Sequence, residues 1–533
     1  MNKKVAFKEY NYTQGELFPQ NISDWIPENH LVRIVDKIIE SIDITPIIES
    51  YPGGGCSSFH PKMMLKVLIY AYCEKIYSVR KIEKALQENI NFIWISGRQL
   101  PDFRTINRFR KRLKKSIKRI FFRVIRFLIK NKIIDFSNYF LDGTKLEANA
   151  NKYSFVWKKS TQRYKTRLLE KINTLFESID KINEKEDEIQ NIKKKLKDKS
   201  IKSEDLKELK SIIDESLKLE NDKELKKIAK SLENNYVPRL EKYEEYEKLL
   251  DGRNSFSKTD TDATFMRMKD DHMMNGQLKA AYNVQIGTQN QFILNYSIHQ
   301  ETTDTTTLIP HLEELKEDFG IMPENVVADS GYGSEENYEY LEEEKINGYV
   351  KYNTFRIEDT NRFKKDIFKK ENFGYDSELN EYICPNGKRL KYKYSKNPKT
   401  ANGYETKTEI YACEECQECP FKSQCTKSQS NRSIQVNHRL DNLRMNAKKL
   451  LKSEKGIELR RKRGVEVESV FGHIKWNRDF NRFMLRGIEN VSLEWGLLSI
   501  AHNMRKVWSL LFLFCVFISF CKVISDRKRR AAF

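Results

Sequence analysis

A long, highly charged segment in the middle of the chain lies between two groups of strand-like sequence, and this constrains the fold most. Residues 158–250 are dense in lysine and glutamate and carry leucine and isoleucine at helical intervals, as in KINEKEDEIQNIKKKLKDKSIKSEDLKELK. The pattern predicts a long antiparallel helical hairpin. Because strand-like sequence lies on both sides, we expect these helices to be inserted into an α/β domain.

The flanking segments predict the strands of that domain. On one side lies SNYFLDGTKLEANANKYSF; on the other, AAYNVQIGT and QFILNYSIHQ predict a β-hairpin closed by a polar turn. A helix follows, DTTTLIPHLEELKEDFG, with Asp304 as its expected N-cap. The next segment, ENVVADSGYGS, predicts a further strand.

The N-terminal region, residues 1–135, carries apolar residues at the three- and four-residue spacing of helices. One helix is predicted over Asp102–Lys115, with Asp102 as its N-cap. Its apolar side chains are interleaved with basic ones, which gives it one face for the core and another for phosphates. A solvated charged face would give the same pattern. The candidate DNA contacts on this helix are Arg104, Arg108, Arg110, Lys111 and Arg112.

The charge balance of the 533 residues favours a polyanionic partner. Lysine and arginine number 96 and aspartate and glutamate 76, which gives a net charge of +20. An excess of this size indicates nucleic acid before membrane. The N-terminal sequence lacks the apolar segment of a secretory signal, so we expect a cytoplasmic protein without a membrane partner.

Two aspartates share a local pattern that is typical of metal-binding sites. Asp142 and Asp329 each follow a short apolar run and are closely followed by glycine. Carboxylates at the C-terminal ends of neighbouring strands are placed to bind ligands, and they repel one another unless a cation lies between them. Mg²⁺ favours such oxygen ligands together with phosphate oxygens. The alternative is a structural aspartate that caps the following turn.

A third carboxylate is expected on the helix RRKRGVEVESVFGHIK. Arg461, Glu468 and Lys475 recur every seven residues and would lie along one stripe of a straight helix. Glu468 could then complete a metal site, with Lys475 contacting phosphate. Glu466 would point to another side of the helix, and an ordinary surface glutamate is the alternative for Glu468.

Five of the nine cysteines lie close together in the sequence: Cys384, Cys413, Cys416, Cys419 and Cys425. Four of the five could supply thiolates for a tetrahedral structural zinc site, and their spacing leaves open which four. Reduced cysteines without a metal are the alternative, and an iron–sulfur cluster is a third interpretation.

Four blocks of sequence, in this order, resemble bacterial insertion-sequence DDE transposases, in particular the 1182-type group of the cut-and-paste superfamily. The resemblance extends from roughly Asp24 to Lys506. It implies a ribonuclease-H-like catalytic core with its three acids at Asp142, Asp329 and Glu468, which would hold two Mg²⁺ or Mn²⁺ ions. The four blocks are FLDGTKLEANANKYSF, MKDDHMMNGQLKAAYNVQIGTQNQFI, VVADSGYGSEENYEYLEE and VEVESVFGHIKWNRDFNRFMLRG.

The glutamate helix of that superfamily has the signature Tyr, two residues, Arg, three residues, Glu, six residues and Lys. Glu468 and Lys475 match its last interval. The Arg position falls on Gly464, with Arg463 one step away, and the Tyr position falls on Arg461. The resemblance therefore defines the acid better than the basic phosphate contacts, for which Arg461 and Arg463 are the candidates.

The resemblance implies a transposase that binds terminal inverted repeats, cleaves DNA with metal-activated water and joins the freed 3′-hydroxyl to target DNA. It would act as a homodimer or larger multimer in the bacterial cytoplasm, associated with the nucleoid. A metal-dependent nuclease without strand transfer and a catalytically inactive DNA-binding protein are the alternatives.

The predicted architecture is an α/β protein whose ribonuclease-H-like core is interrupted by a helical-hairpin insertion and a Cys-rich insertion. An all-α DNA-binding domain precedes the core. The apolar stretch near the C-terminus is shorter than a membrane span needs, and we expect a buried or oligomer-forming helix there. The expected ranges are 1–135 (DNA-binding), 136–157 and 258–340 (core), 158–257 (helical insertion), 341–440 (Cys-rich insertion), 441–506 (glutamate helix) and 507–533 (tail).

Overall fold

The computed structural model divides the chain into two compact units. One contains the N-terminal helices as far as Leu128 together with the chain from Gly496 onward, and the other is Ile129–Trp495. The last helix, α20 (Ile488–Arg530), crosses the division, and beyond residue 511 only its backbone is described. The described residues are 21–51, 57–177, 186–198, 200–219, 222–268, 276–400 and 402–530.

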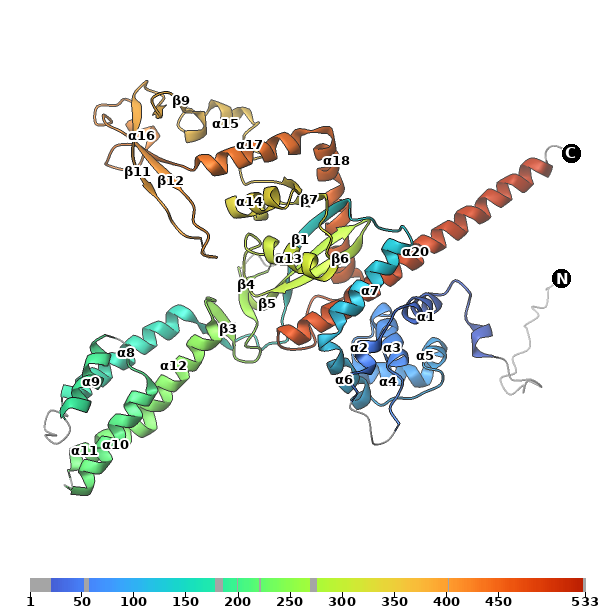
Figure 1. Cartoon of the computed structure of the whole chain (residues 1–533), viewed down its shortest axis with the longest axis horizontal. Helices are drawn as coiled ribbons and strands as arrows, with labels where there is room; N and C mark the ends of the chain where they lie inside the picture. The colour runs from blue at the N-terminus through green and yellow to red at the C-terminus, as the bar shows by residue number, and fades with distance from the viewer. Residues whose placement is uncertain are drawn as a thin grey trace, which may run out of the picture. The chain divides into compact units, whose positions relative to one another are not determined.

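The first unit is helical and is built around α3 (Pro61–Cys73), which is buried along most of its length. Its middle section, from Met64 to Cys73, offers no polar face to solvent, so neighbouring helices cover it on all sides. The C-terminal helix packs on its end, where the Cys73 thiol lies 3.6 Å from the Ala501 carbonyl oxygen. The other helices are α1 (Leu31–Ser41), α2 (Thr45–Ile48), α4 (Val79–Glu88), α5 (Ile90–Ile95), α6 (Phe103–Arg112) and α7 (Ile117–Lys130), shown in blue in Figure 1.

The second unit contains a mixed six-stranded sheet, in yellow-green and teal in Figure 1. Its strands follow the order β4-β5-β1-β7-β8, and β6 pairs with β5. The pairs β4–β5, β5–β6 and β5–β1 are antiparallel, whereas β1–β7 and β7–β8 are parallel. The strands are β1 (Asn138–Glu147), β4 (Thr264–Arg267), β5 (Leu278–Gln289), β6 (Phe292–His299), β7 (Asn325–Ala328) and β8 (Asn347–Val350).

The predicted hairpin is confirmed as β5 and β6, which are joined at Asn290 and Gln291. Both turn residues have positive φ angles, 51° and 64°, as a tight two-residue turn between twisted strands requires. The helix after the hairpin, α13 (Leu308–Phe319), differs from the prediction in its cap. Its N-cap is Thr307, and the Asp304 carboxylate instead accepts a hydrogen bond from Asn283.

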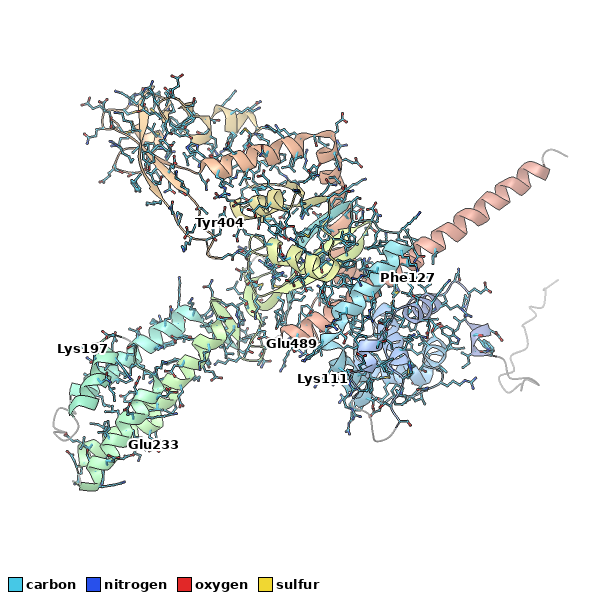
Figure 2. The ribbon with its side chains drawn as sticks, in the orientation of Figure 1. Lys111, Phe127, Lys197, Glu233, Tyr404 and Glu489 are labelled. Carbon is cyan, nitrogen blue, oxygen red and sulfur yellow. The ribbon has the colours of Figure 1, made fainter. Side chains whose placement is uncertain are left out.

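The charged central segment forms helices between two short strands, β2 (Phe155–Trp157) and β3 (Ser255–Ser257), which pair antiparallel. Leucine and isoleucine side chains from successive helices make a separate apolar cluster, with Leu168, Leu206 and Leu240 fully buried. Lys197 and Glu233 mark this segment in Figure 2. The helices are α8 (Lys158–Glu177), α9 (Glu186–Lys197), α10 (Ser203–Leu219), α11 (Lys223–Ser231) and α12 (Val237–Leu250).

A second, antiparallel sheet precedes the C-terminal helices, in the order β13-β12-β11-β10-β9. From it the chain enters α17 (His438–Lys452), which packs against α14 (Glu335–Glu343) and β8, and then α18 (Glu454–Arg463). This path carries the end of α18 back to the first sheet. The strands are β9 (Gly374–Asp376), β10 (Glu381–Ile383), β11 (Arg389–Lys396), β12 (Thr408–Cys413) and β13 (Ser433–Val436).

The apolar C-terminal stretch lies mostly among residues whose side chains are outside the described part. Where its side chains are described, Val507 is buried and Leu510 and Leu511 are exposed. Among the described residues, no helix combines the length and the apolar character that crossing a membrane requires.

Candidate active site

The two predicted aspartates stand on adjacent strands of the first sheet. The parallel register pairs Asn138 with Asn325 and Phe140 with Val327, and the same offset continued by two residues sets Asp142 opposite Asp329. Neighbouring strands lie about 4.8 Å apart, so the two carboxylates are close. Asp142 differs from the prediction in one respect. It lies within β1 and not at its end, because β1 continues as the antiparallel partner of β5.

Each aspartate uses one oxygen to accept a hydrogen bond from the backbone that follows it and directs the other toward Arg463. The Oδ1 atom of Asp142 accepts a hydrogen bond from the Gly143 N–H at 2.9 Å. The Oδ1 atom of Asp329 accepts from the Gly331 N–H at 2.8 Å and caps the 3₁₀ turn that follows β7. The capping interpretation of Asp329 is therefore correct for one oxygen, and the second oxygen is available for another contact.

The second oxygens converge on a single guanidinium. Nη2 of Arg463 lies 3.0 Å from Oδ2 of Asp142 and 3.8 Å from Oδ2 of Asp329. Nη1 lies 3.0 Å from Oε1 of Glu468. The structure thus brings all three predicted acids to one cation, although they are far apart in the sequence. The side chains of Arg463 and Asp142 are about nine-tenths buried, whereas that of Glu468 is 60% exposed.

A π-helical turn, Gly464–Glu468, makes the contact between Arg463 and Glu468 possible. On an α-helix, residues four apart share a face, whereas a π turn closes its ring over five residues. Arg463 and Glu468 are five apart and face one another across this turn. The straight-helix prediction placed Arg461 on this face. That prediction was wrong because the wider turn shifts the face, and Arg461 is exposed.

The π turn is attached to the β5–β6 hairpin. Oε2 of Glu466 accepts a hydrogen bond from the Gln291 N–H at 2.8 Å, and Thr288 donates its hydroxyl to the Glu466 carbonyl oxygen at 3.3 Å. Glu466 therefore points away from the acids, as expected, and fixes the turn on the sheet. Lys475 lies one π turn further on, in His473–Asn477, and is largely buried.

A fourth carboxylate, Asp304, lies near Asp142 and Asp329, and from its sequence position it was expected only as a helix cap. Its Oδ1 atom accepts hydrogen bonds from Asn283 at 2.8 Å and Gln285 at 3.0 Å, two fully buried amides on one face of β5. Tyr332 donates its hydroxyl to Gln285. Burial raises the pKa of Tyr332 well above its ordinary value, and the charges of Asp304, Asp142 and Asp329 add to the rise.

Gly143 is what allows this network to lie against β1. A Cβ atom at this position would be 2.2 Å from Nε2 of Gln285 and 2.8 Å from Oδ1 of Asp304. Both distances are below any real contact, so a side chain at position 143 would displace the amide or the acid. Gly143 therefore allows the strand of Asp142 and the segment of Asp304 to lie in contact.

Cationic side chains lie next to the acids on the side of β8. Lys351 follows β8 directly, and its N–H donates to the Ala328 carbonyl oxygen at 3.4 Å, beside Asp329. Burial lowers the pKa of Lys351, and the charges of Arg356, Arg463 and Arg460 lower it further. A group of like charges of this kind is stabilised by an anion such as a phosphate.

The carboxylates surround the guanidinium of Arg463. In the part of the chain that the structure describes, no three His, Cys, Asp or Glu side chains are arranged so that they could hold a metal ion directly. The donor set nevertheless suits a hard divalent cation, because three carboxylates point into one small volume and the cationic group between them has one delocalised charge.

Two parts of the sequence match known protein families. Residues 383–508, which include Arg463, Glu468 and Lys475, match a model described as a transposase DDE domain. Residues 20–112 match a model described as a transposase domain. These matches indicate an insertion-sequence DDE transposase. They are compatible with the 1182-type group without singling it out, and no curated protein and no solved structure matches the chain.

The predicted basic helix lies within the second match, as α6. Asp102 is confirmed as the N-cap, since its carboxylate accepts from the Thr105 N–H at 2.8 Å. Arg110 differs from the expectation. It is buried and donates to the Tyr77 carbonyl oxygen and to Asn107, so it stabilises the fold and does not face DNA. The basic residues that α6 exposes are Arg104, Arg108, Lys111 (labelled in Figure 2) and Arg112.

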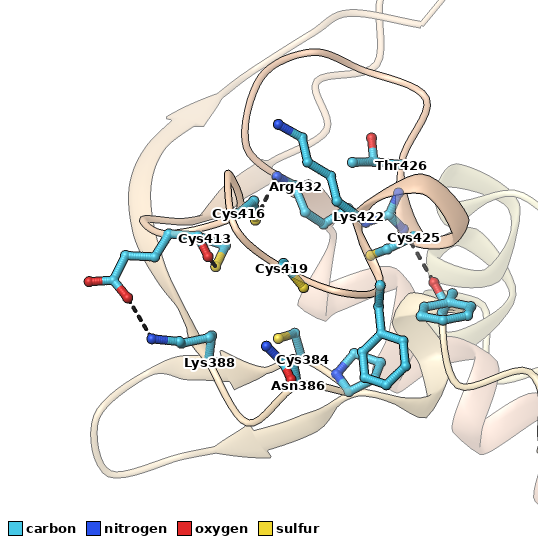
Figure 3. A pocket seen from close by; sticks show the side chains of 14 residues that line it. Cys384, Asn386, Lys388, Cys413, Cys416, Cys419, Lys422, Cys425, Thr426 and Arg432 are labelled. Carbon is cyan, nitrogen blue, oxygen red and sulfur yellow. Dashed lines mark hydrogen bonds and ion pairs between the residues drawn. The ribbon is translucent and has the colours of Figure 1, made fainter.

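The five clustered cysteines line one pocket, and Figure 3 shows their side chains there. Cys384 follows β10, Cys413 ends β12, and Cys425 ends the short helix α16 (Lys422–Cys425). Burial raises the pKa of Cys413 to about 11. The Arg432 N–H donates to the sulfur of Cys416 at 3.4 Å. All five are free thiols in the structure.

Proposed function

We propose that this protein is a cut-and-paste DNA transposase whose catalytic acids are Asp142, Asp329 and Glu468. The observation that supports this most is the convergence of these three side chains, from two strands and a helix, on the single guanidinium of Arg463. A single carboxylate would be enough for a structural salt bridge with Arg463, so the presence of three needs another explanation. A site for divalent cations accounts for the surplus negative charge.

The topology of the first sheet supports a ribonuclease-H-like core, which a DDE domain implies. The strands β6, β5 and β1 are neighbours in the sheet, and each is antiparallel to the next. On the other side of β1, the strands β7 and β8 continue the sheet parallel to β1. With this order, Asp142 lies on the central strand and Asp329 directly after its neighbour. The glutamate then comes from a helix that packs against β1 and β5.

In this proposal the three acids would hold Mg²⁺ or Mn²⁺, which when bound would activate a water or 3′-hydroxyl and stabilise the leaving oxygen. The chain's own groups bind and orient the DNA strand. Lys351, which follows β8 next to Asp329, offers positive charge that can hold a phosphate in line for attack. Asp304 adds a carboxylate fixed by Asn283 and Gln285.

The N-terminal unit would bind the terminal inverted repeats. The exposed basic residues of α6 lie along one short helix, in the spacing that suits phosphate contacts. We further propose that two or more copies assemble on the two ends of the element, because both ends must be cut and joined to one target.

We also propose that four of the five clustered cysteines bind a structural zinc ion. They come from three separate segments, and thiols from distant segments gather at one point when a metal holds them together. Such an ion would fix the ends of β10 and β12 in a part of the chain with few large apolar side chains.

The function is tested with purified protein, Mg²⁺ or Mn²⁺, and DNA that carries the inverted repeats flanking the gene. We expect wild-type protein to cut at the repeat and to join the 3′ end to a second DNA. Asp142→Asn, Asp329→Asn and Glu468→Gln should each lose more than about 100-fold of the cleavage rate, since even indirect metal contacts are worth up to that much. All three should still bind the repeat DNA.

Glu458→Gln is the matched control, because Glu458 is an exposed acid on the same helical segment and pairs with Lys462. It should cleave like wild type. Cutting without joining would identify a nuclease, and specific binding without metal-dependent cutting would identify an inactive DNA-binding protein. Cleavage that survives all three acid substitutions would reject the proposed site.

A further inference from the structure

Arg463 occupies the point on which the three acids converge. We infer that Arg463 is an internal counter-ion that fills the acid pocket when no divalent ion is bound and has to leave before one can enter. This inference rests on the proposed function, since it assumes that Asp142, Asp329 and Glu468 are metal ligands.

The charges of the pocket require a cation at all times. Three carboxylates within contact distance of one group would repel one another strongly in a site where Asp142 is nine-tenths buried. Arg463 offsets part of this repulsion with ion pairs at 3.0, 3.8 and 3.0 Å. One positive charge against three negative ones leaves the pocket attractive to a divalent ion.

The guanidinium and the ions need the same space. Both terminal nitrogens of Arg463 already contact the carboxylate oxygens that would serve as ligands. Mg²⁺ takes oxygen ligands at about 2.0–2.1 Å, so an ion bound to these oxygens would lie almost in contact with the guanidinium. Two cations cannot share this position, and binding is therefore competitive.

One donor of the Arg463 side chain lacks a hydrogen-bond partner in the described part of the structure, which favours release of the side chain from the pocket. This donor is the Nε atom, which is buried. A buried donor without a partner costs about 1–3 kcal/mol. The residue also begins a π turn, a rare helical form, where rewinding to α-helical geometry would move Arg463 relative to Glu468.

Lys351 follows β8 next to Asp329, since its N–H donates to the Ala328 carbonyl oxygen at 3.4 Å, and the charges of Arg463 and Arg460 both act on it. A guanidinium displaced toward Lys351 would need an anion, and a DNA phosphate supplies one. Binding of DNA and binding of metal should therefore support each other through the position of Arg463.

The test compares Mn²⁺ binding by wild-type protein and by Arg463→Gln, measured by titration calorimetry without DNA. If the guanidinium fills the pocket in about nine-tenths of the molecules, apparent affinity is reduced about tenfold, so Arg463→Gln should bind Mn²⁺ about tenfold more tightly. Repeat DNA should tighten Mn²⁺ binding by wild type more than by the variant, because DNA phosphates can ligate the ion in both proteins but only wild type has to release Arg463. Lys462→Gln, which removes an exposed neighbouring charge that pairs with Glu458, should behave like wild type.

The outcomes separate this inference from the proposed function. If wild type binds Mn²⁺ and loses it in Asp142→Asn, but Arg463→Gln binds no more tightly, the counter-ion role is rejected and the metal site stands. If neither wild type nor Arg463→Gln binds Mn²⁺, the proposed function itself fails.

A measurement on wild-type protein avoids any dependence on how the variant folds. Arginine side chains can be modified with phenylglyoxal and the peptides identified by mass spectrometry. Arg463, whose side chain is only 10% exposed in the closed pocket, should react faster when Mn²⁺ is present, while exposed Arg461 should react at the same rate. Equal or slower reaction of Arg463 with Mn²⁺ would contradict the release.

Discussion

Asp304 accepts a hydrogen bond at its Oδ1 atom from Nε2 of Gln285, 3.0 Å away, on the strand beside the one that carries Asp142. Asn283 donates to the same oxygen at 2.8 Å. Two buried amides are thus used to fix one oxygen of a carboxylate. The other oxygen, Oδ2, lies 3.7 Å from where a Cβ atom at Gly331 would be, in the loop of Asp329.

This arrangement predicts that Asp304→Asn weakens metal binding at the proposed site. The substitution removes one negative charge beside Asp142 and Asp329 and leaves the side chain nearly the same size. Loss of a group just outside the ligands typically costs about 10–100-fold in metal affinity, and we expect a Mn²⁺ titration to show a loss in that range.

The control for Asp304→Asn is Glu317→Gln, which removes the same charge from the exposed face of α13. It should leave the Mn²⁺ titration unchanged. If Asp304→Asn also leaves it unchanged while the thermal midpoint falls, Asp304 is a structural residue and not part of the site.

The acids were easier to predict from the sequence than their surroundings. Asp142 and Asp329 each interrupt an apolar run just before a glycine, and β1 and β7 place both at one level of the sheet. The amides that hold Asp304 carry no such signal. Asn283 and Gln285 lie in a strand whose alternation looks ordinary, and only the packed structure shows that both point to one carboxylate.

The glutamate helix shows a limit of spacing arguments. Regular periodicity put Arg461 on the face of Glu468, whereas the structure puts Arg463 there, because Gly464–Glu468 forms a π turn. Arg463 lies one residue before the position at which the signature has its arginine, and the π turn nevertheless brings it to Glu468. Sequence pattern misleads in the same way in α6. Arg110 is a basic residue in a basic helix, as a DNA contact would be, but its side chain is buried like that of a core residue.

Two of the arginines of α6, Arg108 and Arg110, should respond differently to the same substitution. Arg108→Gln removes an exposed charge, so it should weaken DNA binding for all sequences and reduce the salt dependence, the slope of log K against log salt, by about 0.9. Arg110→Gln should leave that slope unchanged and lower the thermal midpoint, because its bonds to Tyr77 and Asn107 are lost. Fluorescence anisotropy at several salt concentrations measures both slopes; an equal slope change in the two variants would contradict the assignment.

The cysteine pocket predicts one zinc ion per chain. Elemental analysis of protein purified without chelator should find it, and changing both Cys416 and Cys419 to serine, which leaves three of the five thiols, should lower the zinc content to well below one ion. Cys73→Ala is the control, since that thiol is buried in the other unit, next to Ala501. Zinc-free wild-type protein that melts at the same temperature with and without added zinc would rule out the ion.

Glu358 predicts an acid-sensitive contact between α17 and the segment after β8. Burial would raise the pKa of its carboxyl group, but hydrogen bonds from Lys448, Thr354 and Tyr352 outweigh burial and hold the pKa below its ordinary value. Because the folded pKa is the lower one, the stabilisation is complete above the unfolded pKa and is lost as the pH falls through the folded pKa.

Glu358→Gln should therefore lower the thermal midpoint at neutral pH, by about 2–4 °C if about 1 kcal/mol is lost, and the difference from wild type should shrink as the pH falls below the ordinary range of a glutamate. Scanning fluorimetry of both proteins between neutral and acidic pH measures this difference. Asp359→Asn is the matched control. Its carboxylate pairs with Lys452 at the surface, with about half of each side chain exposed, and such pairs contribute little. A gap between Glu358→Gln and wild type that stays constant with pH would show that packing, and not the charge of Glu358, holds α17 against the segment after β8.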